Sequence, residues 1–508
     1  MSGRYLLAID NGGTETKAAI FDRDGHEVAV ASRHVPIDFP EPGFTERDAS
    51  LVWEANVHAI QEALATAGIE GADVAGIGLT GYGNGICLVD EQGDAVAPLI
   101  ISTDERAGAL RNELRASGAE REIYPMTCQT LWAAQPACLL PWFKRHRPDI
   151  LDRARWCFGI KDFIRMKLTG NACYELTEAS SGCLMNLHTR AYDDRIFETL
   201  GIADLKDIMP PIVESTAVSG TATEEAAARC GLAAGIPVAG GYFDIDAAAL
   251  ASGVRDCQTL SLVAGTWSIN DHLATEANTD YDKNANTTTL SYWPGHFLVE
   301  ESWATSASNF NWFVTNLLEP DLPKTTSRSA IYRRRDELMA STDPASGDVV
   351  FVPYLFDSST TEGARGTFLN LTGSTTRDDM MLAVCEGVCF STRLNVGRLV
   401  RPGHTFTHAR LSGGVSKSEP WTQMMADILD IPMTTLESSE LTAQGAAMAA
   451  GVACGMFDSL DAAIDAMVHT RKTYEPDPAR RSVYDRKWQT YLRALDALET
   501  FHGQGDPA

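Results

Sequence analysis

The chain has 508 residues, of which 44% are hydrophobic and 22% charged, and its formal net charge at pH 7 is −26. This length exceeds one typical core and predicts two or three domains, and the composition excludes disordered and fibrous classes. The negative charge argues against a nucleic-acid partner or an anionic membrane, because neither would be attracted to this surface at long range.

The start of the chain and its cysteines both predict a cytoplasmic location. MSGRYLLAID leads straight into an apolar segment, without the basic region and cleavage site of a secretory signal. We expect no membrane span, because no run of about 18 apolar residues is free of charged or polar groups. The 11 cysteines form no CxxC pair, which is typical of free thiols in a reducing compartment.

The first predicted element is a strand, a glycine turn and a second strand, in LLAIDNGGTETKAAIFDRDGHEV. Asp10, Gly12, Gly13 and Thr14 lie where apolar residues give way to small ones. Small residues let backbone N–H groups approach an anion, and successive amides in a turn form an anion-binding concavity. Asp10 ends the apolar run, and we interpret it as a residue that holds Mg²⁺, which keeps several waters and only one or two carboxylates. The alternative is an ordinary hairpin.

A helix is predicted next, because apolar residues recur at helical spacing from Trp53 to Leu64 and Asp48 can cap its start. The strand that follows contains GIGLTG (76–81), which spells the GxGxxG of dinucleotide-binding proteins. That motif requires the glycines to open a helix. Here YGNGICLVDEQGD follows, which is interrupted by glycines and then strand-like. We therefore reject a dinucleotide site.

Strands and helices alternate up to Gly241 and predict α/β layering. The strand PVAGGYF then delivers Asp244 to the start of an alanine-rich helix. Phosphoryl transfer needs in-line positioning, neutralised phosphate charge and a carboxylate that accepts the proton of the attacking hydroxyl. We interpret Asp244 as that base; the alternative is a helix N-cap.

The strand–turn–strand pattern returns in TLSLVAGTWSINDHLATE (259–276), with Gly265, Thr266 and Ser268 at its turn. Two such phosphate loops in one chain predict two related lobes that close on one nucleotide. Taken singly, either loop could be a plain hairpin.

The remaining motifs are interpreted as structural. SGGVSKSEPW lacks the GxxxxGK[ST] spacing of a Walker A loop, so Lys417 is interpreted as a solvated loop lysine. Cys385 and Cys389 are interpreted as buried packing residues, because no His or second Cys pair joins them. The segment PARRSVYDRKWQTYLRALDALETF carries an apolar stripe and predicts a C-terminal docking helix.

In order and spacing, these segments resemble the FGGY carbohydrate kinases, which share the actin-like, hexokinase-like ATPase fold. The resemblance covers essentially the whole chain and is carried by DNGGTETK, GYGNGICLVD, STDERA, QPACLLPWFKRHRPD, KDFIRMKLTG, TEASS, GGYFD, AGTWS, PYL with ARGTFLNLT, EGVCF, LSGGVSKSEPWTQMMADILDIPM and TAQGAAMAAG. It implies an α/β fold of two actin-like (ribonuclease H-like) lobes with a cleft between them. The implied ranges are 1–245 for the N-terminal sugar-binding lobe and 246–508 for the C-terminal ATP-binding lobe.

The resemblance also implies ATP and Mg²⁺ as cofactors, Asp244 as the catalytic base and a sugar contact, and Asp10 as the metal residue. The implied nucleotide contacts are Gly12, Gly13, Thr14, Lys17, Gly265, Thr266, Gly413, Gly414, Gln423 and Met424. The implied sugar contacts are Gly83, Asn84, Asp104 and Arg106. Two alternatives stay open: Gln423 and Met424 as ordinary helix surface and core, and Arg106 as part of a structural salt bridge.

TLWAAQPACLLPWFKRH looks most like the L-xylulose kinase branch, which implies phosphorylation of a ketopentose, L-xylulose, at its 5-hydroxyl. Tyr82 and Asn84 stand where D-xylulose kinases usually have Gln and His, and Ile245 where they have Asn, which disfavours D-xylulose. The alternatives are a kinase for D-ribulose, D-xylulose, 3-keto-L-gulonate or erythritol, a catalytically silent sugar-binding regulator, and an actin-like ATPase of the chaperone or filament type. The predicted partner is a small sugar, and a homodimer is the assembly we consider.

Overall fold

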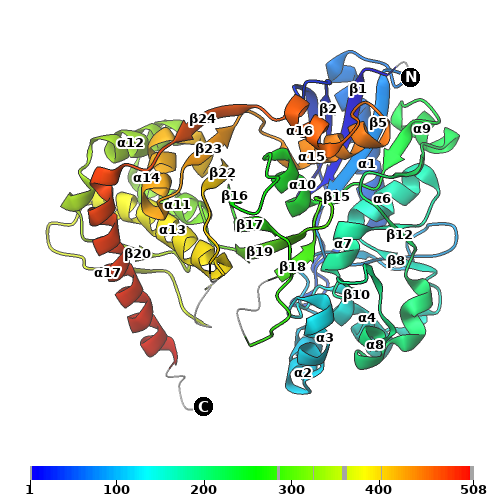
Figure 1. The fold of residues 1–508 in the computed structure, drawn as a ribbon, viewed down its shortest axis with the longest axis horizontal. Coiled ribbons are helices and arrows are strands. Elements are labelled where there is room, and N and C mark those ends of the chain that lie inside the picture. The colour runs from blue at the N-terminus through cyan, green and yellow to red at the C-terminus, as the bar shows by residue number, and fades with distance from the viewer. Residues whose placement is uncertain are drawn as a thin grey trace. The chain divides into compact units, whose positions relative to one another are not determined.

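The computed structural model describes residues 3–282, 287–323, 325–356, 358, 363–401 and 403–503 (Figure 1). It divides into two compact units. The first unit combines the described residues of Met1–Arg255, Leu273–Val299 and Ser438–His469, and the second those of Asp256–His272, Glu300–Glu437 and Thr470–Ala508. The chain therefore returns to the first unit twice. The predicted lobe boundary after residue 245 falls inside helix α10 (Asp244–Ala251) and stays a prediction about the family's two lobes.

The first unit is built on a seven-stranded sheet of order β13-β14-β5-β1-β2-β3, with β15 also paired to β5. Its strands are β1 (Tyr5–Asn11), β2 (Glu15–Phe21), β3 (Glu27–His34), β5 (Val74–Gly81), β13 (Val218–Thr221), β14 (Pro237–Ala239) and β15 (Tyr242–Phe243). β1 and β2 form the predicted antiparallel hairpin, and β5 runs parallel to β1, β14 and β15. Every residue of β5 is buried, so this strand lies at the centre of the unit.

Two helices from distant parts of the chain pack against this sheet (Figure 1). Helix α1 (Ala49–Ala67) begins after its predicted cap, Asp48, which accepts hydrogen bonds from the amides of Ser50 and Leu51. Helix α15 (Leu441–Ala453) packs on β1 and β5. A Cβ atom at Gly78 would collide with the backbone of Ala446 in α15. Gly76 and Gly78 therefore let α15 approach the sheet. The motif GIGLTG is a strand, as predicted.

Shorter elements complete the first unit. The helices are α2 (Gly108–Ala116), α3 (Ala119–Thr127), α4 (Pro136–His146), α5 (Pro148–Leu151), α6 (Ile160–Thr169), α7 (Leu176–Ser181), α8 (Asp194–Thr199), α9 (Glu224–Cys230), α10 (Asp244–Ala251) and α16 (Leu460–Met467). The short strands are β4 (Glu46–Arg47), β6 (Cys87–Val89), β7 (Leu99–Ile100), β8 (Trp156–Phe158), β9 (Tyr174–Glu175), β10 (Met185–Asn186), β11 (Ala191–Tyr192) and β12 (Ile212–Val213).

The second sheet has the order β18-β19-β17-β16-β22-β23-β24. Its strands are β16 (Thr259–Ala264), β17 (Ser268–Ala274), β18 (Thr287–Leu290), β19 (Phe297–Trp303), β22 (His408–Ser412), β23 (Met433–Leu436) and β24 (Thr470–Tyr474). β16 and β17 form an antiparallel hairpin, and β22 runs parallel to β16. This repeats the relation of β1, β2 and β5, so the second strand–turn–strand pattern takes the same place in its sheet as the first.

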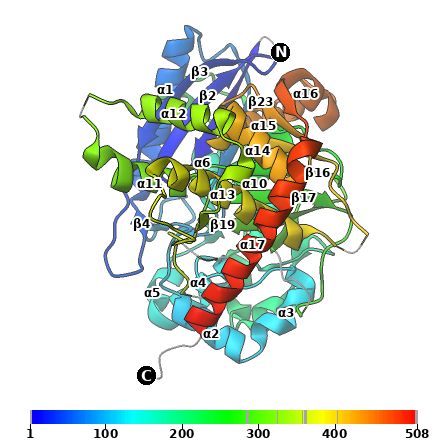
Figure 2. The ribbon, with the colours of Figure 1, turned by 90° about the vertical axis from the view of Figure 1, so that its left-hand side faces the viewer.

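The helices of the second unit include α11 (Ser308–Phe313), α12 (Arg328–Ser341), α13 (Arg377–Leu399), α14 (Glu419–Leu429) and α17 (Pro478–Gly503). Cys385 and Cys389 are buried free thiols in α13, as predicted. Helix α17 packs against α14 (Figure 2). The ring of its Trp488 lies 6.0 Å from the ring of Phe390 in α13, at a tilt of 30°. The C-terminal segment is therefore a docking helix.

Among the helices that the structure describes, none combines the length and the apolar character needed to cross a membrane.

Candidate active site

The tip of the first hairpin is exposed and offers free amides. Asp10 pairs with Lys17 across β1 and β2, and the amide of Gly12 donates to the carbonyl of Glu15 at 2.9 Å. Gly13 and Thr14 follow in the turn, and their amides donate to no acceptor among the described residues. A Cβ atom at Gly13 would meet no atom within 4 Å, so the fold itself does not require glycine there. An anion that approaches the backbone closely would require it.

Arg47 of β4 fixes the orientation of these amides, a role that the sequence analysis did not predict. Its buried guanidinium donates to the carbonyl of Gly12 at 3.2 Å and to the carbonyl of Gly13. In a trans peptide the C=O and the following N–H point in opposite directions. The amides of Gly13 and Thr14 therefore point away from Arg47. Burial lowers the pKa of Arg47. A charged residue of this kind would ordinarily be expected on the surface.

Asp10 lies at the base of the same loop and is 9% exposed. Thr442 at the start of α15 donates a hydrogen bond of 2.6 Å to its Oδ2. Burial raises the pKa of Asp10, although the hydrogen bond from Thr442 and the charge of Lys17 oppose this. A buried carboxylate with a raised pKa gains from a nearby cation, so Asp10 fits the predicted magnesium role. No cluster of three or more His, Cys, Asp and Glu ligands occurs in the described part of the chain.

Lys17, a predicted nucleotide contact, forms an ion pair with Glu440 at 2.8 Å. Burial opposes its charge, but the hydrogen bond to Glu440 and the carboxylates of Glu440, Asp10 and Glu15 together raise the pKa of Lys17. Its ammonium group is therefore charged and lies beside Asp10, where it could also attract phosphate.

Asp244 lies at the same end of the sheet as Asp10. Thr80 of β5 pairs with Asp10 on one side and with Tyr242 of β15 on the other. Because neighbouring strands lie about 4.8 Å apart, Asp10 and the end of β15 are separated by roughly 10 Å. Asp244 follows β15 directly and is half-buried, so a ligand can reach it. It is the first residue of α10 and the N-cap is Phe243, so the alternative of an N-cap aspartate is wrong.

A fully buried ion cluster lies beneath Asp244. Lys161 pairs with Asp162 at 3.0 Å and with Glu175 at 3.1 Å, and Arg165 pairs with Asp162 at 2.6 Å. Arg165 also donates to the carbonyl of Gly240 at 2.8 Å, in the turn before β15. Removing one partner from such a cluster leaves a buried charge uncompensated. The cluster therefore anchors the turn that precedes Asp244, and KDFIRMKLTG supplies its cations.

Thr177 of α7 holds the residue next to Asp244. Its hydroxyl donates to Glu175 at 2.8 Å and accepts a hydrogen bond of 2.9 Å from the amide of Phe243. The motif TEASS thus positions the strand end from which Asp244 projects.

The predicted sugar contacts Gly83 and Asn84 lie beside this strand end. A Cβ atom at Gly83 would clash with the ring of Phe243, so the loop packs directly on the residue before Asp244. Asn84 has a left-handed backbone (φ 65°) and is 8% exposed. Its backbone N–H donates a hydrogen bond of 3.2 Å to Oε1 of Glu178. The structure therefore brings Gly83 and Asn84 together with Asp244.

Asp104 and Arg106 form a closed network instead. Arg106 donates to both oxygens of Asp104, at 2.8 and 3.0 Å, and to Glu46 at 2.8 Å. The amide of Thr45 also donates to Asp104 at 2.7 Å, and Asp104 is fully buried. The guanidinium of Arg106 lies 4.3 Å from the ring centroid of Phe44. These contacts favour the alternative of a structural salt bridge for Arg106, and a sugar contact of either residue stays a prediction.

In the second unit, the loop between β16 and β17 meets the end of β22. Thr266 is exposed, and its carbonyl accepts a hydrogen bond of 2.9 Å from Ser308. Gly413 has φ 85°, and a Cβ atom there would lie 2.7 Å from Ala264, so only glycine fits. A Cβ atom at Gly265 would meet no atom within 4 Å, as at Gly13 in the first loop. Gly414 is exposed and has ordinary space around it.

Gln423 and Met424 lie on α14 and are engaged by the protein. The amide group of Gln423 donates to Asp427 and to the carbonyl of Glu475, both at 2.8 Å. Met424 is 6% exposed. These contacts favour ordinary helix surface and core, and an adenosine contact stays a prediction.

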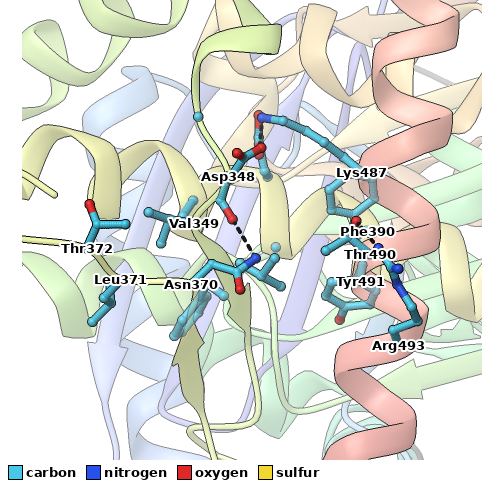
Figure 3. Close-up of a pocket in the computed structure, with 16 residues that line it drawn as sticks. Asp348, Val349, Asn370, Leu371, Thr372, Phe390, Lys487, Thr490, Tyr491 and Arg493 are labelled. Atoms are coloured by element: carbon cyan, nitrogen blue, oxygen red, sulfur yellow. Dashed lines mark hydrogen bonds and ion pairs between the residues drawn. The ribbon is translucent and has the colours of Figure 1, made fainter. Parts of the chain in front are cut away.

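The second unit contains a cavity of about 540 Å³ (Figure 3). It is lined by residues around β20 (Val350–Val352) and β21 (Thr367–Leu369) and by α13 and α17, including Asp348, Asn370 and Lys487. None of the predicted site residues lines it.

Comparison with known proteins identifies the family. Residues 5–251 match the N-terminal domain and residues 260–454 the C-terminal domain of the FGGY family of carbohydrate kinases. The chain is 31% identical to the L-xylulose/3-keto-L-gulonate kinase of Escherichia coli K12, over 99% of this chain and 98% of that protein. The chain belongs to the FGGY family of carbohydrate kinases.

Other members of the FGGY family show the same likeness. The chain is 31% identical to a probable L-xylulose kinase of Pasteurella multocida, over 97% of this chain and 99% of that protein. The crystal structure of a xylulose kinase from Rhodospirillum rubrum matches with a TM-score of 0.87 and 28% identity, over 99% of this chain and 100% of that chain. The predicted α/β fold and kinase class are thereby confirmed: the chain is an enzyme that phosphorylates a carbohydrate, and its family uses ATP as the donor.

Proposed function

We propose that this kinase transfers the γ-phosphate of ATP to the 5-hydroxyl group of L-xylulose. The observation that carries the proposal is the register of β1, β5 and β15, which sets the Asp10 hairpin and Asp244 at one end of the first sheet. The names of the Escherichia coli and Pasteurella multocida relatives support the choice of sugar.

In this proposal Asp244 accepts the proton of the 5-hydroxyl as the phosphoryl group transfers. The amides of Gly13 and Thr14 donate hydrogen bonds to phosphate oxygens, and Gly265 and Thr266 are the phosphate contacts that we propose in the second unit. Mg²⁺ held near Asp10 would neutralise part of the phosphate charge. The role of the protein is thus mainly to position two substrates and to hold one base.

Four cations of the first unit are already engaged by other groups of the protein, which favours a neutral sugar. Lys17 pairs with Glu440, Arg106 with Asp104, and Lys161 with Asp162. Arg47 is directed at backbone carbonyls. A sugar acid would need a cation that is not already committed, whereas a ketose needs only hydrogen-bonding groups.

A second candidate substrate is 3-keto-L-gulonate, because the name of the Escherichia coli relative includes it. The remaining alternatives are D-xylulose, D-ribulose and erythritol. A cytoplasmic location and a homodimer also remain proposals.

The test is sugar-dependent release of ADP, measured as kcat/KM for L-xylulose, D-xylulose, D-ribulose, 3-keto-L-gulonate and erythritol. We expect L-xylulose to give the highest value, and phosphate at its 5-position in the product. A higher kcat/KM for another compound would reassign the substrate, and no ADP release with any of them would contradict the proposal.

A further inference from the structure

Three of the buried polar atoms near Asp244 that have no hydrogen-bond partner among the described residues belong to Asn84 and its neighbours. They are Oε2 of Glu178, Oδ1 of Asn84 and the hydroxyl of Tyr82. All three residues are less than 9% exposed. Buried polar groups in native proteins are nearly always satisfied, so such a cluster is a place where a polar ligand or ordered water belongs.

Glu178 joins this cluster to the proposed base. It is fully buried in α7, and its Oε1 accepts the 3.2 Å hydrogen bond from the amide of Asn84. A Cβ atom at Gly159 would lie 3.0 Å from the same oxygen, so the carboxyl group rests against the backbone before α6. Glu178 follows Thr177, which holds the amide of Phe243. The position of Glu178 is therefore fixed from two sides, while its Oε2 has no hydrogen-bond partner among the described residues.

The surroundings of Glu178 favour the neutral form of its carboxyl group, mainly through burial. Burial raises the pKa of Glu178 well above its ordinary value, Lys161 opposes this, and the carboxylates of Asp162, Asp244 and Glu175 add to it. Lys161 is itself shared between Asp162 and Glu175. A neutral carboxyl group whose Oε1 accepts a hydrogen bond carries its proton on Oε2, which makes Oε2 a donor.

We propose that Glu178 is a further sugar-contacting residue, whose Oε2–H donates a hydrogen bond to a hydroxyl group of the acceptor sugar beside Asn84 and Asp244. This inference rests on the proposed function and adds to it a residue that discriminates between sugars. A polyol can satisfy the donor of Glu178 and the acceptor of Asn84 together, because each hydroxyl group both accepts and donates.

The test compares Glu178→Met with Glu178→Gln. Methionine keeps the length of the side chain and removes both hydrogen bonds. Glutamine can accept from the amide of Asn84 and place its NH₂ group where Oε2–H stands. We expect Glu178→Met to weaken sugar binding about tenfold or more and to leave the KM for ATP unchanged, and Glu178→Gln to recover most of the loss.

The binding of deoxy sugars distinguishes a sugar contact from a purely structural role, because a structural role would not change the relative Kd values of the analogues. The Kd values of L-xylulose and its 1-deoxy, 3-deoxy and 4-deoxy analogues are measured by calorimetry without ATP. We expect the wild type to reject one analogue by about tenfold, and Glu178→Met to lose that discrimination. The matched control is Glu120→Met in α3, an equally buried carboxylate whose oxygens accept from Arg115 and Tyr281. It should lower Tm and keep the discrimination.

The outcomes separate this inference from the proposed function. If Glu178→Met binds and discriminates like the wild type, the inference is overturned, while ADP release with L-xylulose leaves the function standing. If Glu178→Met does not fold, Glu178→Gln tests the inference instead. A tenfold loss of sugar affinity in Glu178→Gln would contradict the role of Glu178 as a neutral hydrogen-bond donor. If L-xylulose binds and this binding depends on Glu178 but no ADP is released, the inference holds and the proposed function fails. If no sugar binds the wild type, both fail.

Discussion

The hydroxyl of Thr442 donates a 2.6 Å hydrogen bond to Asp10, although the two residues lie 432 positions apart in the chain. The contact joins the end of β1 to the start of α15, which the chain reaches only after it has completed most of the second unit. Asp10 is thus a buried carboxylate that a distant helix holds in place.

Asp10→Asn is expected to stabilise the ligand-free protein and to abolish stabilisation by MgATP. Because burial raises the pKa of Asp10 above 3.8, the folded state binds this proton more tightly than the unfolded state does. Stability is therefore lost as the pH rises from 3.8 through the folded-state pKa, and the charged carboxylate is a cost at neutral pH. Asparagine removes that cost.

Scanning calorimetry checks this prediction. At neutral pH the Tm of Asp10→Asn should exceed that of the wild type, and the gap should narrow as the pH falls toward 3.8. MgATP should raise the Tm of the wild type only. A lower Tm for the variant throughout would mean that the folded protein stabilises the carboxylate, contrary to our account.

Arg47→Lys is expected to raise the KM for ATP roughly tenfold, with the KM for the sugar unchanged. A lysine keeps the charge but cannot donate in the planar fork that reaches the carbonyls of Gly12 and Gly13. Steady-state kinetics with each substrate varied provide the measurement. Arg111→Lys on α2, whose guanidinium donates to Asn112, serves as the control. An unchanged KM for ATP would remove Arg47 from the loop's function.

Glycine substitutions should separate ligand approach from packing. Gly13→Ala adds a methyl group into open space, so its Tm should match that of the wild type while ATP binding weakens by about tenfold. Gly78→Ala drives a methyl group into the backbone of Ala446 and should cost about 1–3 kcal/mol or more of unfolding free energy. Thermal melts and ATP titrations distinguish the two. Normal ATP binding by Gly13→Ala would show that phosphate does not approach this loop closely.

The sequence was sufficient for the two hairpins, for the strand that leads into Asp244 and for the docking of α17, because each rests on local periodicity or on residues that are near neighbours in the chain. The supports of the site were not predictable in this way. Arg47 stands beside Asp48 in the sequence and gives the impression of a surface cation. Thr442 and Glu440 lie 432 and 423 positions along the chain from their partners Asp10 and Lys17. Glu178 belongs to the motif TEASS, and the sequence does not show that its Oε2 has no hydrogen-bond partner among the described residues.

The glycines show the same limit. Gly13, Gly265 and Gly413 look alike in the sequence, yet only Gly413 is required by the fold, through its positive φ and the close approach of Ala264. The fold does not require glycine at Gly13 or Gly265, whereas a ligand that approaches the backbone closely would require it. The boundary predicted after residue 245 falls inside α10, which follows directly on β15 of the first unit, and it stays a prediction.

The most direct test of the central claim is the turnover of Asp244→Asn with L-xylulose and ATP, compared with Asp246→Asn. Asp246 lies two residues along the same helix, is fully buried, and accepts a 2.8 Å hydrogen bond from the amide of Tyr292. We predict that Asp244→Asn keeps the Kd of the sugar and loses about 10²–10⁴-fold in kcat, whereas Asp246→Asn loses Tm and retains most of its kcat when folded. A near-normal kcat for Asp244→Asn would contradict the account.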